Sequence, residues 1–383
     1  MKEAIWVAIV KKIVLTGGPC AGKTTALSWT VSNFEKLGWK VIVVNEVATQ
    51  LIMSGIRPND FVSLYNFQKM ILLKQLDDEN RLEWAAQNTI LPPEQKILFV
   101  CDRGACDGRA YVPEKTFHSL LKEAGITLQQ AFDRYDAVFH LVTAADGAEK
   151  YYSLVSNAAR KETPREAILL DIATQEAWAG HKNFYVISND GLTFKKKLQL
   201  LMAKIAEVLG ESEPLETRRR FLINYPNEDY LGTDTSCRKV EILQTYLMSG
   251  RNEEVYVRQR GINGDFSFTK VVKHDAGDPA HPIELESRLE RDDYVKLLIN
   301  ADPDMTPIHK TRYCFLDQAN HHYFEIDIFP EPRNYALLDV DVRDKLEKVT
   351  LPPWIEVVDE VTYDQRFSSR EIARTGGRLP MKI

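Results

Sequence analysis

The sequence predicts two domains in series: an α/β P-loop-type domain with a parallel sheet over residues 1–210, and an antiparallel β domain over residues 211–383. Length is the first indication, because 383 residues exceed what one ordinary hydrophobic core organises. The second is a change of pattern near Gly210, where alternating apolar runs and amphipathic helical stretches give way to period-two alternation. The polar, proline-containing segment 211–215 between the two patterns is a predicted linker.

The predicted strands of the first domain are short β-branched runs bounded by Gly, Asn or Asp. Helices are predicted at 61–86, 116–134 and 192–209, the last closed by Gly210 as a C-cap. This alternation favours βαβ units on a parallel sheet. The strands are Lys12–Thr16, Lys40–Val44, Ile97–Cys101, Ala137–Val142 and Phe184–Ile187.

The second domain is predicted to be an antiparallel barrel or sandwich. Turn residues such as Asn263-Gly264 separate its strands, and one helix is predicted over Asp292–Ile299. The predicted strands are Glu216–Asn224, Lys239–Leu247, Glu254–Arg260, Asp265–Lys273, Ile283–Leu289, His309–Leu316, His322–Ile328 and Ala336–Val342.

Composition excludes several classes of protein. A hydrophobic fraction of 44% and a charged fraction of 27% are typical of a globular chain. No apolar run approaches the roughly 18 residues of a membrane span. Five scattered cysteines without a C-x-x-C pair argue against disulfides and structural zinc, so we expect a cytoplasmic protein. Residues 1–210 carry a net charge of +2 and residues 211–383 a net charge of −8, which argues against nucleic acid as a partner.

The strongest motif is a phosphate-binding loop between the first predicted strand and a helix. It fits G-x-x-x-x-G-K-[ST] in full. Its backbone N–H groups and the helix N-terminus would bind the β-phosphate. Lys23 would reach the β- and γ-phosphates, and the Thr24 hydroxyl would bind Mg²⁺. The predicted nucleotide-binding residues here are Gly17, Gly18, Pro19, Cys20, Ala21, Gly22, Lys23, Thr24 and Thr25.

A second element completes the predicted nucleotide site. The apolar strand Ile97–Cys101 ends in Asp102, the place where a P-loop protein needs a carboxylate for the Mg²⁺ shell. Arg103 follows, near the transferring phosphoryl group or the substrate. Lys23, Asp102 and Arg103 are the predicted catalytic residues, and Mg²⁺ is the predicted cofactor.

Several other residues lie near this predicted site, and the sequence leaves their roles open. Glu46 ends the second strand and either positions a substrate or caps a helix. Arg160 and Arg165 belong either to a lid over the phosphates or to a solvated helix face. Asn189 ends the last strand and could border the base. The chain has no N-K-x-D sequence, the motif that reads guanine, so a Ras-type domain is disfavoured. The sequence does not decide whether the nucleotide is ATP or GTP.

Charged residues in the second half sit two apart on predicted strands, hence on one strand face. We prefer a barrel with a charged interior to a solvated outer face, because the alternate positions are often apolar. Lys270 and Lys273, three apart, cannot both point inward. The predicted polyanion-binding cations are Arg218, Arg220, Arg258, Arg260, Lys273, Lys310 and Arg312. The predicted carboxylates for a divalent metal are Glu216, Glu284, Glu286, Glu325 and Asp327.

These motifs carry a resemblance that covers nearly the whole chain. Residues 12–190 resemble the P-loop domain of nicotinamide-riboside-kinase-type proteins, through Ile13–Thr25, Leu37–Thr49 and Cys101–Asp107. Residues 216–373 resemble the CYTH or triphosphate-tunnel fold, and this pairing is that of the TRPL translocation defect protein family. The matching segments are Glu216–Ile223, Gln244–Leu247, Val257–Gly261, Lys310–Tyr313 and Glu360–Ala373.

The resemblance implies GTP or ATP in the first domain and a phosphate-rich ligand, such as a phosphoinositide at a membrane surface, in the second. One departure matters. CYTH enzymes usually open with two glutamates and a lysine at alternate positions, where this chain has Glu216, Arg218 and Arg220. The change weakens the metal site that hydrolysis needs and favours binding without turnover.

Three functions therefore stay open. The first is a Mg-nucleotide-binding protein whose second domain binds a phosphate-rich ligand. The second is a small-molecule kinase of the nucleoside or nucleotide type, with Glu46, Asp102 and Arg103 at the acceptor site. The third is a CYTH-type triphosphatase fused to a regulatory NTPase.

Overall fold

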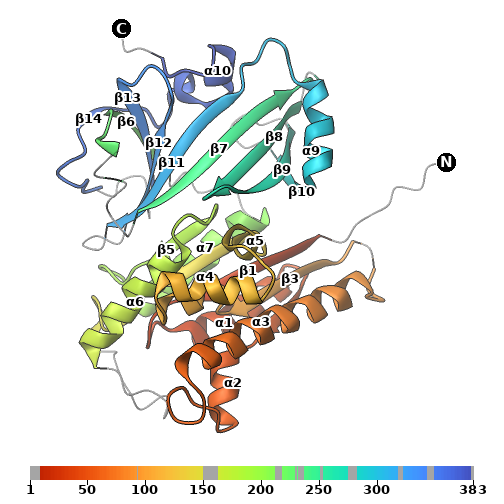
Figure 1. Ribbon diagram of the computed structural model, residues 1–383, viewed down its shortest axis with the longest axis vertical. Coiled ribbons are helices and arrows are strands. Elements are labelled where there is room, and N and C mark those ends of the chain that lie inside the picture. The colour runs from red at the N-terminus through yellow and green to blue at the C-terminus, as the bar shows by residue number, and fades with distance from the viewer. Residues whose placement is uncertain are drawn as a thin grey trace. The chain divides into compact units, whose positions relative to one another are not determined.

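The structure, a computed structural model, describes residues 9–92, 94–149, 163–211, 218–228, 231, 237–250, 253–274, 283–317, 322–342 and 349–380. The chain divides into two compact units, Met1–Ser212 and Glu213–Ile383, each with a sheet of its own (Figure 1). Separate hydrophobic clusters pack against the two sheets.

The first unit is built on a five-stranded parallel sheet in the order β2-β3-β1-β4-β5. The parallel α/β sheet is as predicted. β1 lies between β3 and β4, so the strand order reverses at its carboxyl end, where open α/β sheets bind their ligands. The strands are β1 (Val10–Thr16), β2 (Trp39–Val44), β3 (Lys96–Asp102), β4 (Ala137–Leu141) and β5 (Phe184–Ile187).

Helices cover both faces of this sheet. α1 and α7 bury Phe34 and Leu201 against the face that carries Ile13. α3 packs on the opposite face, where its Glu79 pairs with Lys12 of β1. The helices are α1 (Lys23–Lys36), α2 (Val47–Met53), α3 (Leu64–Gln87), α4 (Glu114–Glu123), α5 (Leu128–Asp133), α6 (Pro164–Trp178) and α7 (Phe194–Leu209), with a 3-10 turn η1 (Asp107–Ala110).

The prediction of one helix over 116–134 is wrong: α4 and α5 are separate. Gly125 has a φ of +73°, a left-handed conformation that interrupts the helical backbone. Thr127 then starts α5 through a capping box with Gln130. The predicted C-cap of α7 is confirmed, because Gly210 is left-handed with a φ of +70°.

The second unit is one antiparallel sheet of nine strands in the order β10-β9-β8-β7-β11-β12-β13-β6-β14. The hairpin between β8 and β9 turns at Asn263-Gly264, both with positive φ, as predicted. The strands are β6 (Arg218–Asn224), β7 (Arg238–Leu247), β8 (Glu253–Ile262), β9 (Asp265–His274), β10 (Ile283–Leu289), β11 (Ile308–Asp317), β12 (His322–Ile328), β13 (Tyr335–Asp341) and β14 (Val357–Glu360). Helices α9 (Arg291–Leu297) and α10 (Ser369–Arg374) and 3-10 turns η3 (Leu298–Asn300) and η4 (Gln365–Phe367) complete it.

The predicted closed barrel is corrected by this sheet, which stays open among the described residues. β10 and β14 are its two edges, and β14, which the sequence pattern did not reveal, pairs with β6. Alternation predicts strands, but it does not say which strands find a partner at the ends of the sheet. The open sheet still separates two faces, and the aromatic and aliphatic residues of β6, β11, β12 and β13 form a core on one of them.

Candidate nucleotide site and charged sheet face

The phosphate-binding loop lies at the carboxyl end of β1 and leads directly into α1. Gly17 has a φ of +145°, and a Cβ there would lie 2.2 Å from the carbonyl oxygen of Leu141, so only glycine fits. Gly22 is also left-handed, with a φ of +87°, and forms the N-cap of α1. The Lys23 Nζ donates to the carbonyl oxygens of Gly17 and Gly18 at 3.0 and 3.1 Å. The loop thus has the curvature that aims backbone N–H groups at a phosphate.

Asp102 ends β3 beside this loop, paired in register with Leu15. Its Oδ1 is buried and has no hydrogen-bond partner among the described residues. Burial raises the pKa of Asp102, while the charges of Lys23 and Arg103 act in the opposite direction. A buried carboxylate oxygen without a donor is suited to a cation. Thr24 and Thr25 are exposed in the first turn of α1. Thr24 and Asp102 fit the donor set that Mg²⁺ prefers.

Arg103 is held in one orientation by two carboxylates. Its φ is +71°, and its guanidinium lies 3.2 Å from Glu46 and 2.9 Å from Asp107. Asp107 also accepts hydrogen bonds from the Gly104 N–H at 2.8 Å and from the Thr16 hydroxyl. No contact of Asp107 was predicted from the sequence, although this residue lies in the run that follows the strand.

Glu46 occupies the N-cap position of α2 but makes no side-chain cap hydrogen bond to the helix backbone. It accepts from the Thr49 hydroxyl at 2.5 Å and pairs with Arg103. Burial would raise the pKa of Glu46, but Arg103 and Lys23 outweigh it, and the pKa is lowered. The carboxylate is therefore ionised at the edge of the site.

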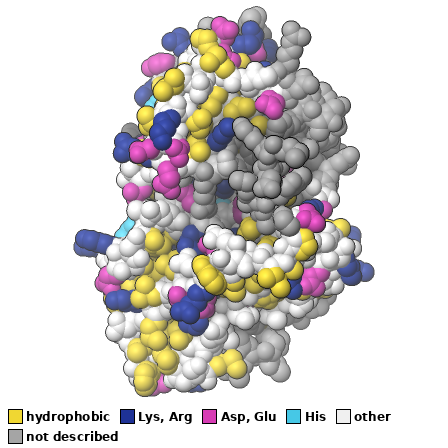
Figure 2. Space-filling model, turned by 90° about the vertical axis from the view of Figure 1, so that its right-hand side faces the viewer, with side chains coloured by type: hydrophobic (Ala, Val, Ile, Leu, Met, Phe, Trp, Pro, Cys, Tyr) yellow, Lys and Arg dark blue, Asp and Glu magenta, His cyan; other side chains and the backbone are white. Residues whose placement is uncertain are grey.

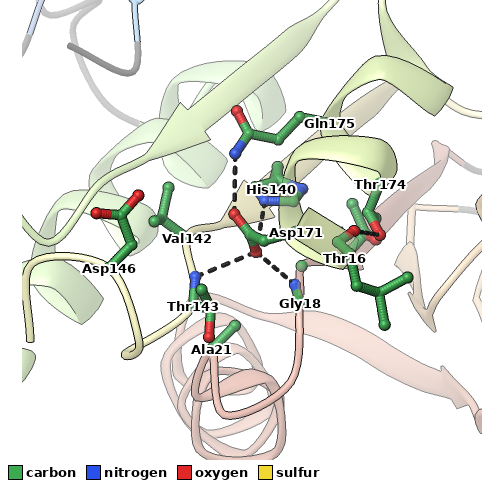
Figure 3. A network of polar contacts seen from close by, with 12 residues as sticks. Thr16, Gly18, Ala21, His140, Val142, Thr143, Asp146, Asp171, Thr174 and Gln175 are labelled. Atoms are coloured by element: carbon green, nitrogen blue, oxygen red, sulfur yellow. Dashed lines mark hydrogen bonds and ion pairs between the residues drawn. The ribbon is translucent and has the colours of Figure 1, made fainter. Parts of the chain in front are cut away.

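A buried network behind the loop was also missed (Figure 3). Asp171 of α6 accepts from the Gly18 N–H at 2.6 Å and from the Thr143 N–H at 3.1 Å. His140 of β4 lies 3.1 Å from the same oxygen, and Gln175 donates to the other oxygen at 2.9 Å. Burial alone would raise the pKa of Asp171, but His140 and these donors lower it. No local pattern in the sequence predicts this contact, because 153 positions separate Gly18 from Asp171.

Asn189 is buried and braces the loop that follows β4. Its amide donates to the carbonyl oxygens of Thr143 and Asp146 at 2.7 and 2.6 Å. Its Oδ1 accepts from Lys197, which also donates to Val142 at 2.6 Å. Burial lowers the pKa of Lys197 to about 7. The predicted contact of Asn189 with a base stays a prediction, and the visible role of its side chain is to support the loop.

The predicted polyanion-binding cations of the second unit lie on one face of the sheet. Directly paired residues of an antiparallel sheet share a face, and the pairs Arg218–Asp341, Arg220–Asp339 and Arg312–Asp327 belong to it. Lys273 shares this face, whereas Lys270, paired with Val257, lies on the other. The same register places Arg258, Arg260, Lys310, Glu284, Glu286 and Glu325 on the charged face.

One end of this charged face is neutralised by ion pairs. Arg312 binds Asp327 through two nitrogens, at 2.6 and 2.8 Å, and Lys310 lies 2.5 Å from Asp327. Arg220 binds Asp339 at 2.7 and 2.8 Å, and Arg218 pairs with Glu325. Burial would raise the pKa values of Asp327 and Asp339, but the cations hold both far below the ordinary value.

The other end of the charged face differs. Arg258 donates to Gln244 at 3.3 Å and to the Tyr256 hydroxyl at 3.1 Å, and no ion pair joins it to a carboxylate of the described residues. Burial lowers the pKa of Arg260, which is 7% exposed. Both arginines lie on this face of β8, and their direct partners across the sheet are uncharged.

Parts of the predicted sites lie outside the described residues, and the roles of the predicted site residues stay predictions. Arg160 and Glu216 lie outside the described residues, as does the side chain of Glu284, and Arg165 is exposed in the first turn of α6. Among the described residues no three His, Cys, Asp or Glu side chains group as a metal site would require. The metal site of the second unit stays a prediction.

Positive and negative side chains are mixed on the part of the surface that Figure 2 shows. Within the described ranges, no helix combines the length and the apolar character that crossing a bilayer demands.

Comparison with known proteins identifies the first unit. Residues 12–193 match the family model described as AAA domain, so this part of the chain is an AAA-type P-loop domain. No curated protein matches the chain.

Solved structures give partial matches to the chain. One described as an inorganic triphosphatase is 23% identical with a TM-score of 0.31, and the match covers 41% of this chain and 93% of that one. A protein from Pyrococcus horikoshii OT3 is 16% identical with a TM-score of 0.25, over 33% of this chain and 80% of that one.

Proposed function

We propose that the first unit binds ATP or GTP together with Mg²⁺. The observation that carries the proposal is the complete phosphate-binding loop at the carboxyl end of β1, with the orphaned Asp102 Oδ1 beside it. Thr24 and Asp102 would hold Mg²⁺, which when bound neutralises phosphate charge. Lys23 would move from the Gly17 and Gly18 carbonyls to the β- and γ-phosphates.

The test of nucleotide binding is Lys23→Ala, measured by calorimetry with Mg-ATP and Mg-GTP on the full chain. Because the lysine neutralises phosphate charge, we expect loss of measurable binding with the fold intact. Lys36→Ala, in the last turn of the same helix, is the matched control and should bind as the wild type does. Unchanged affinity of Lys23→Ala for both nucleotides would refute the proposal.

A second candidate function is phosphoryl transfer to a small acceptor. It is favoured by Arg103, held between Glu46 and Asp107, and by the ionised Glu46 carboxylate. An acceptor hydroxyl oxygen would attack the γ-phosphorus while its proton passes to Glu46, and the bond to the nucleoside diphosphate would break. Arg103 would stabilise the transferring group.

The test of transfer is a screen for an acceptor hydroxyl compound that accelerates nucleotide consumption. Glu46→Gln keeps the size of the side chain but cannot take the proton, so we expect transfer to fall while nucleotide affinity stays. Glu35→Gln, on an exposed position of α1, is the control. If no acceptor accelerates consumption, or if Glu46→Gln transfers as well as the wild type, this candidate function is wrong.

We also propose that the charged face of the second unit binds a phosphate-rich ligand, including a phosphoinositide headgroup at a membrane surface. Arg258 and Arg260, whose direct partners across the sheet are uncharged, would make the first contact. The ligand would then compete with Glu325, Asp327 and Asp339 for their cations. Arg218 stands where CYTH enzymes carry the second glutamate, and Arg220 stands where they carry the lysine. The loss of one carboxylate weakens the metal site, so binding without hydrolysis is favoured over a triphosphatase. The pairing of this unit with the AAA-type domain supports membership in the TRPL translocation defect family.

The polyanion site is tested with the double change Arg258→Ala and Arg260→Ala in the full chain. We expect it to abolish binding of tripolyphosphate and of soluble inositol phosphates. The control double change, Lys239→Ala with Lys270→Ala, removes cations from the other face and should bind normally. Vesicles with and without phosphoinositide distinguish a lipid headgroup from a free phosphate. If the wild type binds none of these polyanions, the charged face has another role.

A further inference from the structure

The phosphate-binding loop is fixed from behind by a buried carboxylate that lies far away in the sequence. Asp171 is 2% exposed, and its Oδ1 accepts from the Gly18 and Thr143 N–H groups at 2.6 and 3.1 Å. These two amides belong to the phosphate-binding loop and to the loop after β4. One oxygen atom therefore ties together two loops at the carboxyl edge of the sheet (Figure 3).

The carboxylate itself is held in place from two further directions. His140, fully buried in β4, lies 3.1 Å from Oδ1, and Gln175, one turn along α6, donates to Oδ2 at 2.9 Å. α6 begins with proline and a capping box between Thr163 and Glu166, so its backbone is well anchored. The hydrogen bonds that Asp171 accepts from Gly18, Thr143 and Gln175 go to a carboxylate, and such charge-assisted bonds are short and directional.

The space around Gly18 leaves no room for a side chain beside Asp171. A Cβ on Gly18 would lie 2.6 Å from Asp171 Oδ1, closer than atoms can approach. The glycine therefore lets the backbone N–H reach the carboxylate. Two turns further along α6, Trp178 donates to Asp107, the carboxylate that holds Arg103, at 3.2 Å.

We propose that Asp171 is a positioning residue that presets the phosphate-binding loop for nucleotide, with α6 as the rigid element that aligns this loop with the Arg103 loop. This proposal rests on the proposed nucleotide binding. The loop keeps its binding conformation before a nucleotide arrives, because the Gly18 N–H is already satisfied by Asp171. Without that acceptor, nucleotide binding has to order the loop first and loses affinity.

The mutational test compares three variants with Mg-ADP, Mg-GDP and their triphosphates. Asp171→Asn keeps an oxygen for both amides, and the Gln175 amide can rotate to present its oxygen, which has no partner in the described structure. We expect about tenfold or greater loss of affinity for Asp171→Ala and rescue by Asp171→Asn. Ala167→Gly, a buried change in the same helix away from the loop, should lower the melting temperature and leave affinity unchanged.

A second measurement, hydrogen exchange, uses only the wild type and therefore does not depend on whether a variant folds. In the nucleotide-free wild type, amide hydrogen exchange at Gly18 and Thr143 should be slow, as for buried bonded amides. Fast exchange at Gly18, unchanged affinity of Asp171→Ala, or an equal loss of affinity in Ala167→Gly would overturn the proposal. If the wild type binds no nucleotide, the proposed function fails, and the exchange measurement still decides whether Asp171 holds the loop.

Discussion

Buried carboxylates of the first unit differ in what surrounds their oxygen atoms. Asp171 meets two backbone N–H groups, an imidazole and an amide. The Oδ1 of Asp102, by contrast, has no hydrogen-bond donor among the described residues. In the first case these contacts compensate the free-energy cost of burying a charge, whereas in the second case the proposed Mg²⁺ would do so. This contrast separates a structural carboxylate from one that is available to a ligand.

At the residue scale we predict that Asp102→Asn weakens nucleotide binding only when Mg²⁺ is present. The amide keeps the shape of the side chain but removes the charge that attracts the cation. With EDTA the affinity should change little or rise, because a negative charge near the phosphates is gone. Calorimetry with and without Mg²⁺ measures this difference, and an equal loss in both conditions would show that Asp102 acts on something other than the metal.

A second residue-scale prediction concerns the proton on Lys310. Burial lowers its pKa to about 8, although Asp327 acts in the opposite direction. A bound polyanion favours the charged amine and raises this pKa, so binding should take up protons above pH 8 and weaken as the pH rises further. Calorimetry in two buffers of different ionisation enthalpy measures the uptake. Lys310→Arg, which stays charged, should abolish it, and uptake that persists in this variant would assign the proton to another group.

At the element scale, α6 links the two loops of the nucleotide site from one side of the sheet. Asp171 holds Gly18, and Trp178 donates to Asp107, which in turn holds Arg103. Trp178 lies seven positions after Asp171, which is about two helical turns, so both side chains project from the same side of α6. A helix with this role has to be fixed at both ends, and the stacking of Trp178 on Phe132 contributes to that.

We therefore predict that Trp178→Phe lowers the free energy of unfolding by about 2–3 kcal/mol, from a smaller buried ring and the loss of one hydrogen bond to a charged group. Urea unfolding of the full chain gives the value. Trp84→Phe is the matched control, because Trp84 is 66% exposed on α3 and its replacement should leave stability nearly unchanged. A similar effect of both changes would contradict the role of Trp178.

At the scale of the whole molecule, the two proposed sites belong to different units. The proposed nucleotide site draws on β1, β3 and α1, and the charged face draws on β6, β8, β11, β12 and β13. Each unit also has a core of its own.

We predict that ligands protect the two units separately in hydrogen exchange on the intact chain. Mg-nucleotide should slow exchange around residues 17–25 and at the end of β3, whereas tripolyphosphate should slow exchange in β8 and β11. The reason is that a ligand stabilises the residues it contacts against local opening. Protection of both units by either ligand would show that the sites are coupled.

What the sequence determined by itself is whatever depends on short-range pattern. The loop from Gly17 to Thr24, the strands of both sheets except β14, and the shared face of the predicted cations follow from spacings of a few positions. The positions of Asp102 and Arg103 after a buried strand follow in the same way.

Only the tertiary structure decided the contacts between distant segments. The approach of Asp171 to Gly18, the choice of Asp327 and Asp339 as partners of the arginines, and the open edges of the second sheet all depend on how whole elements pack. The periodicity of a sequence predicts which face of a strand or helix is buried. It does not predict which group of another element packs against that face. That information exists only once the chain has folded.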